Sequence, residues 1–364
     1  MIKIYDMETL EEREILFRGG SGADVSAPVA EILRAVQERG DAALREYTLR
    51  FDGAAPDALA VTAEEVDQAA AQVEPAFLAV LEEAAEHIRA YHARQKRESF
   101  VMTEREGGVL GQRIIPLARV GIYVPGGTAA YPSTVLMNAI PARIAGVGEI
   151  IMVTPPGRDG AVNPHILAAA KIAGVTRIYK VGGAQAVAAL AYGTGTIPQV
   201  DKIVGPGNAY VAEAKRQVFG RVNIDMIAGP SEVLVLADGR SNPAWVAADL
   251  LSQAEHDRMA AAVLVTDSRP LAEAVAHELE RQLAALPRAE IARASLEANG
   301  KLIVCRDLRE GIAVANRIAP EHLELCVDNP FDYLGEIQNA GSVFLGRYNP
   351  EPMGDYFAGP NHTL

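Results

Sequence analysis

The chain has 364 residues, enough for two or three domains, and its 34 Lys and Arg against 47 Asp and Glu give a formal net charge of −13. A hydrophobic fraction of 49% and a charged fraction of 22% exclude a disordered chain, and the acidic balance argues against nucleic acid or a membrane surface as a partner. No signal-peptide layout and no apolar run of about 20 residues occurs. The two cysteines, Cys305 and Cys326, lie in apolar runs typical of a core, and their scarcity indicates a reducing compartment, the cytoplasm.

The first hundred residues predict helices. Residues 26–47 carry apolar side chains at helical spacing, with Gly40 as a possible break. Thr62 precedes two glutamates and an Ala-rich stretch, which predicts a capped helix start. A further helical stretch carries His87 and His92, whose spacing of five residues does not match a helical metal pair, so we interpret both as solvated surface residues.

From about residue 109, short apolar runs alternate with helical runs. The runs VGIYV, EIIMV, RIYKV and KIV each precede glycines or prolines and then an Ala-rich helical segment. After Gly229 the rhythm continues with EVLVLADG, AAVLVTD and KLIVC. This alternation predicts an α/β fold with buried parallel sheets in two similar blocks. The Gly- and Pro-rich turns fall at the expected carboxyl ends of strands, where ligands gather in open α/β sheets.

Cofactor motifs of the usual kind are absent from the sequence. It contains no GxGxxG, no GxxxxGK[ST] and no GxSxG. The turns ending in Gln185 and Asn208 place glycines and then an amide at a helix start, which suits a phosphate or a ribose. A third turn, Gly229-Pro230-Ser231, would present the hydroxyl of Ser231. Each turn is equally consistent with a routine strand-to-helix connection in which the polar residue is only a cap.

Side chains suited to metal binding and proton transfer occur in three places. Gln253 and His256 lie three residues apart near a predicted helix end and could share a face. Glu321 and His322 place a carboxylate next to an imidazole, which suits a site where protons move. Asp355, in a glycine-rich segment, could be an oxygen ligand for a metal that His256 also binds. A polar helix end, a surface dipeptide and an ordered loop explain the same residues without any chemistry.

Taken together and in order, the motifs resemble the histidinol dehydrogenase family from the N-terminal helices to Leu364. The segments that carry the resemblance are VGIYVPGGTAAYPSTVLMNAIPARIAGV, KVGGAQAVAALAYGT, DKIVGPGNAYVAEAKRQV, IDMIAGPSEVLVLAD, DLLSQAEHD, APEHLEL, NAGSVFLG and GDYFAGPNHTL. The resemblance implies two incomplete Rossmann-like domains with parallel-rich sheets plus an N-terminal helical extension, which accounts for the missing GxGxxG. We expect a helical arm at 1–20, a domain of 21–120 together with 232–364 that carries the zinc and catalytic residues, and a domain of 121–231 that carries the NAD contacts.

The resemblance further implies a homodimeric enzyme that oxidises L-histidinol to L-histidine in two NAD-dependent steps, through an aldehyde and its hydrate, with a bound zinc ion. Carried over by motif, Glu321 and His322 match the catalytic pair. His322 would take the hydroxyl proton in each oxidation, and Glu321 would activate the water that adds to the aldehyde. The remaining matches are Gln253, His256 and Asp355 for zinc; Tyr123, Gln185 and Asn208 for NAD; and Ser231, Gln253, His256, His322, Asp355 and His362 for substrate.

Members of this family continue past the NHTL motif with a tail that gives a further zinc-binding histidine and a substrate-binding glutamate to the partner subunit. The present sequence supplies three of the zinc ligands, and we expect weaker zinc binding and impaired activity without the tail. Two kinds of alternative remain at this stage. One is a related dehydrogenase of another small alcohol, and the other is a non-catalytic homologue that binds nucleotide. A metallohydrolase would explain the metal and the base but not the turns at Gln185 and Asn208.

Overall fold

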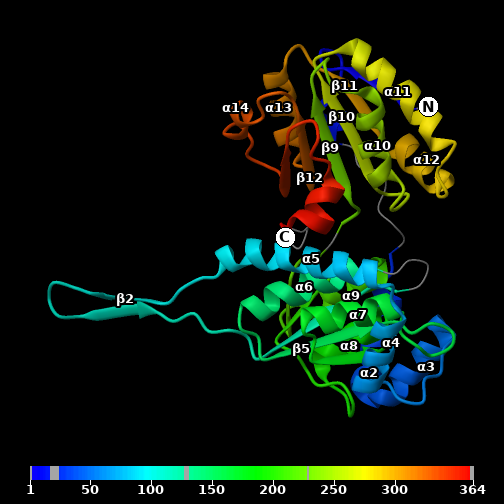
Figure 1. The fold of residues 1–364 in the computed structure, drawn as a ribbon, viewed down its shortest axis with the longest axis vertical. Coiled ribbons are helices and arrows are strands. Elements are labelled where there is room, and N and C mark those ends of the chain that lie inside the picture. The colour runs from blue at the N-terminus through cyan, green and yellow to red at the C-terminus, as the bar shows by residue number, and fades with distance from the viewer. Residues whose placement is uncertain (1, 17–23, 127–130, 228, 361–364) are drawn as a thin grey trace. The chain divides into compact units, whose positions relative to one another are not determined.

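The computed structural model describes residues 2–16, 24–126, 131–227 and 229–360, which form two compact units (Figure 1). Unit 1 comprises Met1–Ser21 and Gly229–Asp355, and unit 2 comprises Gly22–Ala228 and Tyr356–Leu364. Both units are α/β with parallel sheets, which confirms the predicted fold class. Within the described ranges, no helix has the length and apolar character needed to cross a membrane.

Unit 2 is built on a five-stranded parallel sheet with strand order β6-β5-β4-β7-β8. Alternate residues of its strands face two separate cores, as expected of a sheet covered on both sides. Ile150 and Met152 of β5 pack with α5, α6 and α7, whereas Ile151 and Val153 pack with α2, α8 and α9. The bounds are β4(Arg119–Tyr123), β5(Glu149–Thr154), β6(Arg177–Lys180), β7(Lys202–Val204), β8(Asn223–Ile224), α6(Pro132–Ile144), α7(Pro164–Ala173), α8(Gly183–Tyr192) and α9(Ala209–Val218).

The helices that precede this sheet follow the sequence pattern closely. They are α2(Ser26–Arg39), α3(Asp41–Asp52), α4(Ala63–Gln72) and α5(Pro75–His92). Gly40 separates α2 from α3 with a φ of 54°, a left-handed value that favours glycine. Thr62 and Glu65 form a reciprocal capping box at the start of α4. His92, expected at the surface, is instead buried, with its Nδ1 2.6 Å from Gln95 Oε1.

These helices also change the predicted division of the chain. Residues 22–120 belong to the same compact unit as residues 121–228, and not to that of residues 232–355. The physical reason is apolar contact, since Val29 and Leu33 of α2 share one core with α8, and Leu81 and Ile88 of α5 share the other with α6.

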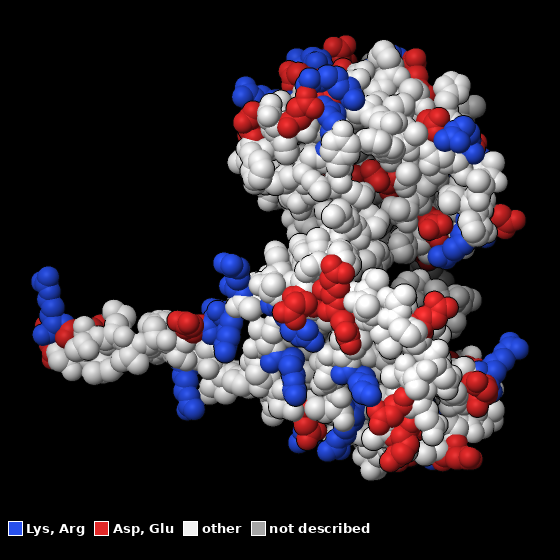
Figure 2. Space-filling view, in the orientation of Figure 1, with Lys and Arg blue, Asp and Glu red and all other residues white. Residues whose placement is uncertain are grey.

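An exposed hairpin extends from unit 2 (Figure 1). Its strands, β2(Phe100–Thr103) and β3(Val109–Gln112), pair antiparallel and are exposed along their whole length. Val101 is 75% exposed and Val109 67% exposed. Between its charged groups, the surface of the extended hairpin seen in Figure 2 is largely uncharged. A two-stranded hairpin that buries neither face is only marginally stable in water by itself.

Unit 1 is built on a six-stranded parallel sheet with strand order β1-β11-β10-β9-β12-β13. Helices α10, α11 and α12 pack on one face, and α13 with the α1 segment packs on the other. The N-terminal arm was predicted to be helical, but residues 4–6 form the edge strand β1 before α1. The bounds are β1(Ile4–Asp6), α1(Glu12–Leu16), β9(Glu232–Ala237), α10(Pro243–Ala254), β10(Ala261–Thr266), α11(Arg269–Leu283), α12(Ala289–Ala298), β11(Lys301–Val304), α13(Leu308–Ile318), β12(His322–Cys326), α14(Phe331–Leu334), β13(Ser342–Leu345) and α15(Glu351–Met353).

The two sheets share one strand order once β1 is set aside. In each, the first strand lies in the interior, the next two add on one side, and the last two add on the other. The order therefore reverses between β4 and β7 in unit 2 and between β9 and β12 in unit 1. The crevice at the carboxyl end of such a reversal is the usual ligand position in open α/β sheets.

Candidate active site

His322 is the first residue of β12 and lies at the amino end of the unit 1 sheet, where it is 3% exposed. Its Nδ1 is 3.2 Å from the carbonyl oxygen of Glu232 on the neighbouring strand. A carbonyl oxygen can only accept, so Nδ1 carries the proton and donates it, and Nε2 keeps its lone pair. Nε2 is buried and has no hydrogen-bond partner within the described part of the chain. An imidazole held in this tautomer is prepared to accept a proton or bind a metal.

Glu321 and Ser231 lie at the same end of the sheet. The backbone N–H of Glu232 donates to Glu321 Oε2 at 3.2 Å, and Glu321 Oε2 is 3.8 Å from His322 Nδ1. Ser231 immediately precedes β9 and accepts through its carbonyl oxygen from the N–H of Ala261. The structure therefore places the predicted acid–base pair side by side, with Ser231 at the start of the adjacent strand.

Asp355 reaches the site from the turn that follows α15. Its Oδ1 is 3.8 Å from His322 Nε2, and its side chain is 4% exposed. The preceding Gly354 allows this approach, because a Cβ there would lie 2.4 Å from the ring of Phe344 on β13. The sequence analysis paired Asp355 with His256, and the structure places its carboxylate beside His322.

Glu351 completes a buried group that the sequence did not reveal. Ligand atoms of His322, Glu351 and Asp355 lie within 4.8 Å of one another, and together they could hold a metal ion. Burial, with the charge of Asp355 adding to it, raises the pKa of Glu351 to about 9. A single glutamate between two prolines gives no local signal of a site, and only the fact that it begins a turn ending at Asp355 could have suggested it.

Two further carboxyl groups lie behind this group. Glu324, two residues along β12 from His322, is 1% exposed, and the carboxyl group of Asp249 on α10 lies within hydrogen-bonding reach of it. Burial raises the pKa of Asp249 to about 6 and, together with the charge of Asp249, raises the pKa of Glu324 well above its usual range. Carboxyl groups gathered in a dry site disfavour their own ionisation and favour a cation.

The predicted metal pair Gln253 and His256 lies at the end of α10, where the N–H of His256 donates to the carbonyl oxygen of Gln253 at 3.1 Å. Gln253 lies in the last turn of the helix and is 3% exposed, whereas His256 follows the C-cap and is exposed. Among the described residues, His256 is not a member of the group formed by His322, Glu351 and Asp355.

In unit 2, two of the predicted cofactor residues come together at the carboxyl end of the sheet. Tyr123 ends β4, and its hydroxyl accepts from the N–H of Gly183 at 3.0 Å. Gln185 lies in the first turn of α8, and a Cβ on Gly183 would lie 2.6 Å from its Oε1. Gln185 is 1% exposed, and its Nε2 donor has no hydrogen-bond partner within the described part of the chain. A buried, unused donor beside a glycine fits a bound ligand with acceptor oxygens.

The turn that carries Asn208 packs against the same strand end. A Cβ on Gly205 would lie 2.2 Å from the carbonyl oxygen of Tyr123, and Gly205 has a φ of 112°. The buried Lys215 donates to the Gly205 carbonyl oxygen and is paired with Asp225, which in turn accepts from the N–H of Gly205. Asn208 Oδ1 caps α9 by accepting from Tyr210 and Val211. The interpretation of Asn208 as a helix cap therefore holds for its side-chain oxygen. Its Nδ2 donor makes no hydrogen bond within the described part of the chain and is available to a ligand.

Two other features of the structure bear on the predictions. His362 lies outside the described residues. Unit 2 also contains a cavity of about 500 Å³ between α4, α7 and the turn at Pro155. None of the three predicted cofactor residues lines this cavity within the described part of the chain, so the cofactor prediction does not rest on it.

The fold and these side chains define a two-unit α/β enzyme with a buried imidazole and carboxylates suited to proton transfer and metal binding. The family model for histidinol dehydrogenase matches residues 18–364. A histidinol dehydrogenase of Listeria monocytogenes is 54% identical over 357 residues, covering 98% of this chain and 83% of that protein. One of Geobacter metallireducens is 57% identical over 360 residues, covering 98% and 82%. The crystal structure of histidinol dehydrogenase from Elizabethkingia anophelis matches with a TM-score of 0.95 and 40% identity, covering 100% of this chain and 84% of that one.

The chain therefore belongs to the histidinol dehydrogenase family, which confirms the resemblance read from its motifs. Members of that family are oxidoreductases.

Proposed function

We propose that this protein oxidises L-histidinol to L-histidine in two successive NAD-dependent steps at a zinc site in unit 1. The observation that carries the proposal is the placement of His322, Glu321 and Asp355 at one end of the sheet, where His322 Nε2 is buried and has no hydrogen-bond partner among the described residues. In the first step the alcohol loses a hydride and a proton to give the aldehyde. Water then adds to form the hydrate, which loses a second hydride and proton to give the acid.

His322 is the residue that we assign to both deprotonations. Because the Glu232 carbonyl fixes the proton on Nδ1, the lone pair of Nε2 is available to take the hydroxyl proton as the hydride leaves. The same atom serves again when the hydrate is oxidised. Between the two steps the proton must pass to water, since the catalytic cycle needs neutral imidazole twice.

Glu321 is the residue that we assign to the hydration step. Its carboxylate is fixed by the Glu232 N–H and stays partly exposed, so that water can reach it. A carboxylate in this position can take a proton from the water that attacks the aldehyde. This division of labour predicts that Glu321→Gln slows oxidation of the aldehyde by about 10²–10⁴-fold and of the alcohol much less. The two rates are measured with histidinal and histidinol as separate substrates, and an equal loss in both would refute the assignment.

The residues near His322 fit a divalent metal. Imidazole nitrogen and carboxylate oxygen are ligands that zinc accepts, and the clustered buried carboxyl groups favour a cation. We propose Asp355, Gln253 and His256 as the zinc ligands of this chain, with Ser231 and His362 among its substrate contacts. Bound zinc would hold the imidazole and amine of histidinol and so orient the alcohol carbon for oxidation.

Tyr123, Gln185 and Asn208 are the residues that we propose for NAD, which accepts one hydride in each step. The buried Nε2 of Gln185 and the Nδ2 of Asn208 are donors suited to ribose or phosphate oxygens. The left-handed glycines Gly183 and Gly205 let the backbone approach a ligand closely.

The whole proposal is tested by incubating the zinc-loaded protein with NAD and either L-histidinol or a simple vicinal diol. We expect two NADH per histidinol consumed, histidine as the product, and negligible turnover of the diol. Equal turnover of both substrates would instead assign the chain to another small alcohol. Absence of NADH formation with every alcohol, together with absence of metal, would identify a non-catalytic homologue.

We also propose a homodimer in the cytoplasm. The exposed apolar hairpin β2–β3 supports self-association, and the two free buried cysteines suit a reducing compartment. Sedimentation of the wild type and of Val101→Glu tests the first point. We expect the charged variant to dissociate, and an unchanged dimer would exclude this hairpin from the interface.

A further inference from the structure

Helix α10 and strand β12 contribute side chains to the same core of unit 1, in a register that the sequence does not reveal. As the crossover between the parallel strands β9 and β10, α10 runs from the carboxyl end of the sheet back to its amino end. Asp249 and Gln253 lie one turn apart on it, so their side chains share a face. On β12, Cys326 packs in the same core as Val246 and Leu250 of α10, and the period of two puts His322 and Glu324 on that side as well.

One contact sets the register between these two elements. The carboxyl groups of Asp249 and Glu324 lie within hydrogen-bonding reach of each other. Gln253 lies four residues beyond Asp249, about 6 Å along the axis of α10. His322 lies two residues before Glu324, about 6.7 Å along β12. Both steps run toward the amino end of the sheet. The Asp249–Glu324 contact therefore places Gln253 alongside His322.

Glu324 also holds a third element. Its Oε1 accepts from the backbone N–H of Glu351 at 2.7 Å, at the start of α15. Four residues later the same turn delivers Asp355, 3.8 Å from His322. One buried side chain thus contacts both the helix that carries Gln253 and the turn that carries Asp355.

We propose that Glu324, hydrogen-bonded to the Glu351 amide and in contact with Asp249, is a positioning residue that fixes Gln253 and Asp355 around His322 for metal binding. The inference rests on the proposed zinc site. Glu324 touches neither metal nor substrate. It acts through the two ligands, in the way that groups behind metal ligands commonly orient them, with about 10–100-fold effects on affinity when removed.

The chemistry of the contacts supplies a conservative variant. A hydrogen bond between two carboxyl groups needs a proton on one of them. In Glu324→Gln, the amide oxygen can still accept from the Glu351 N–H while the amide nitrogen donates to Asp249. Glu324→Leu removes both contacts at similar volume. The pair separates the loss of positioning from the loss of packing.

The experiment measures zinc affinity by competition with a chelator and the visible d–d spectrum of the Co²⁺-loaded protein. We expect Glu324→Leu to bind zinc about 10–100-fold more weakly and to show a changed Co²⁺ spectrum, with a raised KM for histidinol and an unchanged KM for NAD. Glu324→Gln should restore affinity and spectrum to near wild type. Asp249→Ala removes only the contact with α10 and should weaken zinc binding by a smaller factor. This variant also tests the inference if Glu324→Leu fails to fold.

Ser241→Ala is the matched control. Ser241 donates to the carbonyl oxygen of Cys326 at the opposite end of β12, so this variant loses a buried hydrogen bond to the same strand. It should lower stability without changing metal affinity. Unchanged zinc affinity and Co²⁺ spectrum in both Glu324→Leu and Asp249→Ala would overturn the inference while leaving the proposed function intact. A wild-type protein that binds neither metal would overturn both.

Discussion

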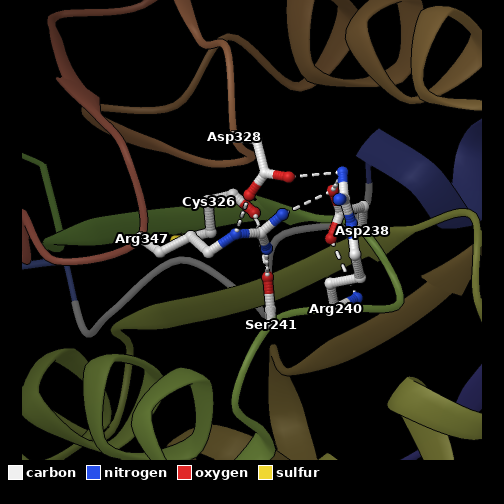
Figure 3. Close-up of polar contacts among 6 residues, drawn as sticks. All are labelled: Asp238, Arg240, Ser241, Cys326, Asp328 and Arg347. Carbon is white, nitrogen blue, oxygen red and sulfur yellow. Dashed lines mark hydrogen bonds and ion pairs between the residues drawn. The ribbon is translucent and has the colours of Figure 1, made fainter.

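The two units have the same strand order, β1 apart, but their candidate site residues lie at opposite ends of the sheets. In unit 2 the reversal between β4 and β7 is lined by glycine turns, and the residues that we propose for NAD lie there at the carboxyl end. In unit 1 the corresponding reversal between β9 and β12 is filled by Arg347, which bonds Asp238, Ser241, Asp328 and the Cys326 carbonyl (Figure 3). The candidate acid–base residues of unit 1 lie at the amino end instead.

The comparison shows that strand order creates the crevice, whereas the side chains that line it determine whether a ligand can enter. A reversal of strand order makes a crevice, but it stays usable only where glycines and short turns line it. Arg347 satisfies two carboxylates and two further oxygens, and so it occupies that crevice with protein groups. The candidate site of unit 1 lies instead where β9 and β12 begin and where the turn at Asp355 returns to the sheet.

The largest effect should come from His322→Ala. We expect a loss of about 10²–10⁴-fold in kcat for both histidinol and histidinal, because one base serves both oxidations. NAD affinity, measured by titration, should stay at the wild-type value since its proposed residues lie in unit 2. His277→Ala, an exposed histidine on α11, is the control and should leave all rates unchanged. If His322→Ala instead lost NAD affinity and kept the wild-type kcat for both substrates, the assignment of roles to the two units would be wrong.

The second prediction compares the buried cations of the two units. The side chain of Lys215 is 3% exposed, and Lys215→Met leaves the equally enclosed Asp225 without its partner, at a cost of about 3–5 kcal/mol in the free energy of unfolding. Arg347→Met should cost less, about 1–3 kcal/mol, because the side chain of Asp328 is 42% exposed and water can solvate it. Urea unfolding measures both. A larger loss for Arg347→Met would reverse the ranking of the two networks.

A third prediction separates capping from cofactor binding at Asn208. Aspartate caps helices as well as asparagine does, so Asn208→Asp should keep α9 and the stability of the protein. It replaces the Nδ2 donor with a carboxylate oxygen, and the KM for NAD should rise about five- to thirty-fold. Asn242→Asp makes the same change at the cap of α10 in unit 1 and should leave that KM unaltered. Equal effects of the two substitutions would mean that Asn208 is only a cap.

Local signals in the sequence predicted most of the fold. The break at Gly40, the capping box at Thr62 and the alternating strands and helices depend on residues within one or two turns, and the structure has them. The edge strand β1 was missed because three residues carry too little periodicity. The assignment of residues 22–120 differed because an amphipathic helix does not specify which apolar sheet it covers.

The site divides in the same way. His322, Glu321 and Asp355 lie in recognisable motifs, and the structure brings them together. Glu351 and the pair Asp249–Glu324 were not predicted, because their role arises only when α10, β12 and the turn after β13 pack. No spacing along the chain connects these three elements.

The smallest expected effect concerns Asp52, a half-buried carboxylate in unit 2, in contrast to Asp249 of unit 1, which lies beside Glu324. Asp52 ends α3, its Oδ2 is buried without a partner within the described part of the chain, and burial raises its pKa to about 6. Because the folded state favours the protonated form, its contribution to stability is present below pH ~3.8 and is lost as the pH rises through about 6. Asp52→Asn should therefore stabilise the protein by about 1–2 kcal/mol at pH 7.5, discounted for partial exposure, and by almost nothing at pH 4. Urea unfolding at the two pH values measures this, with the exposed Asp57→Asn as control. A difference that does not change with pH would mean that Asp52 is solvated in the folded protein and that the unit 2 sheet tolerates its charge without cost.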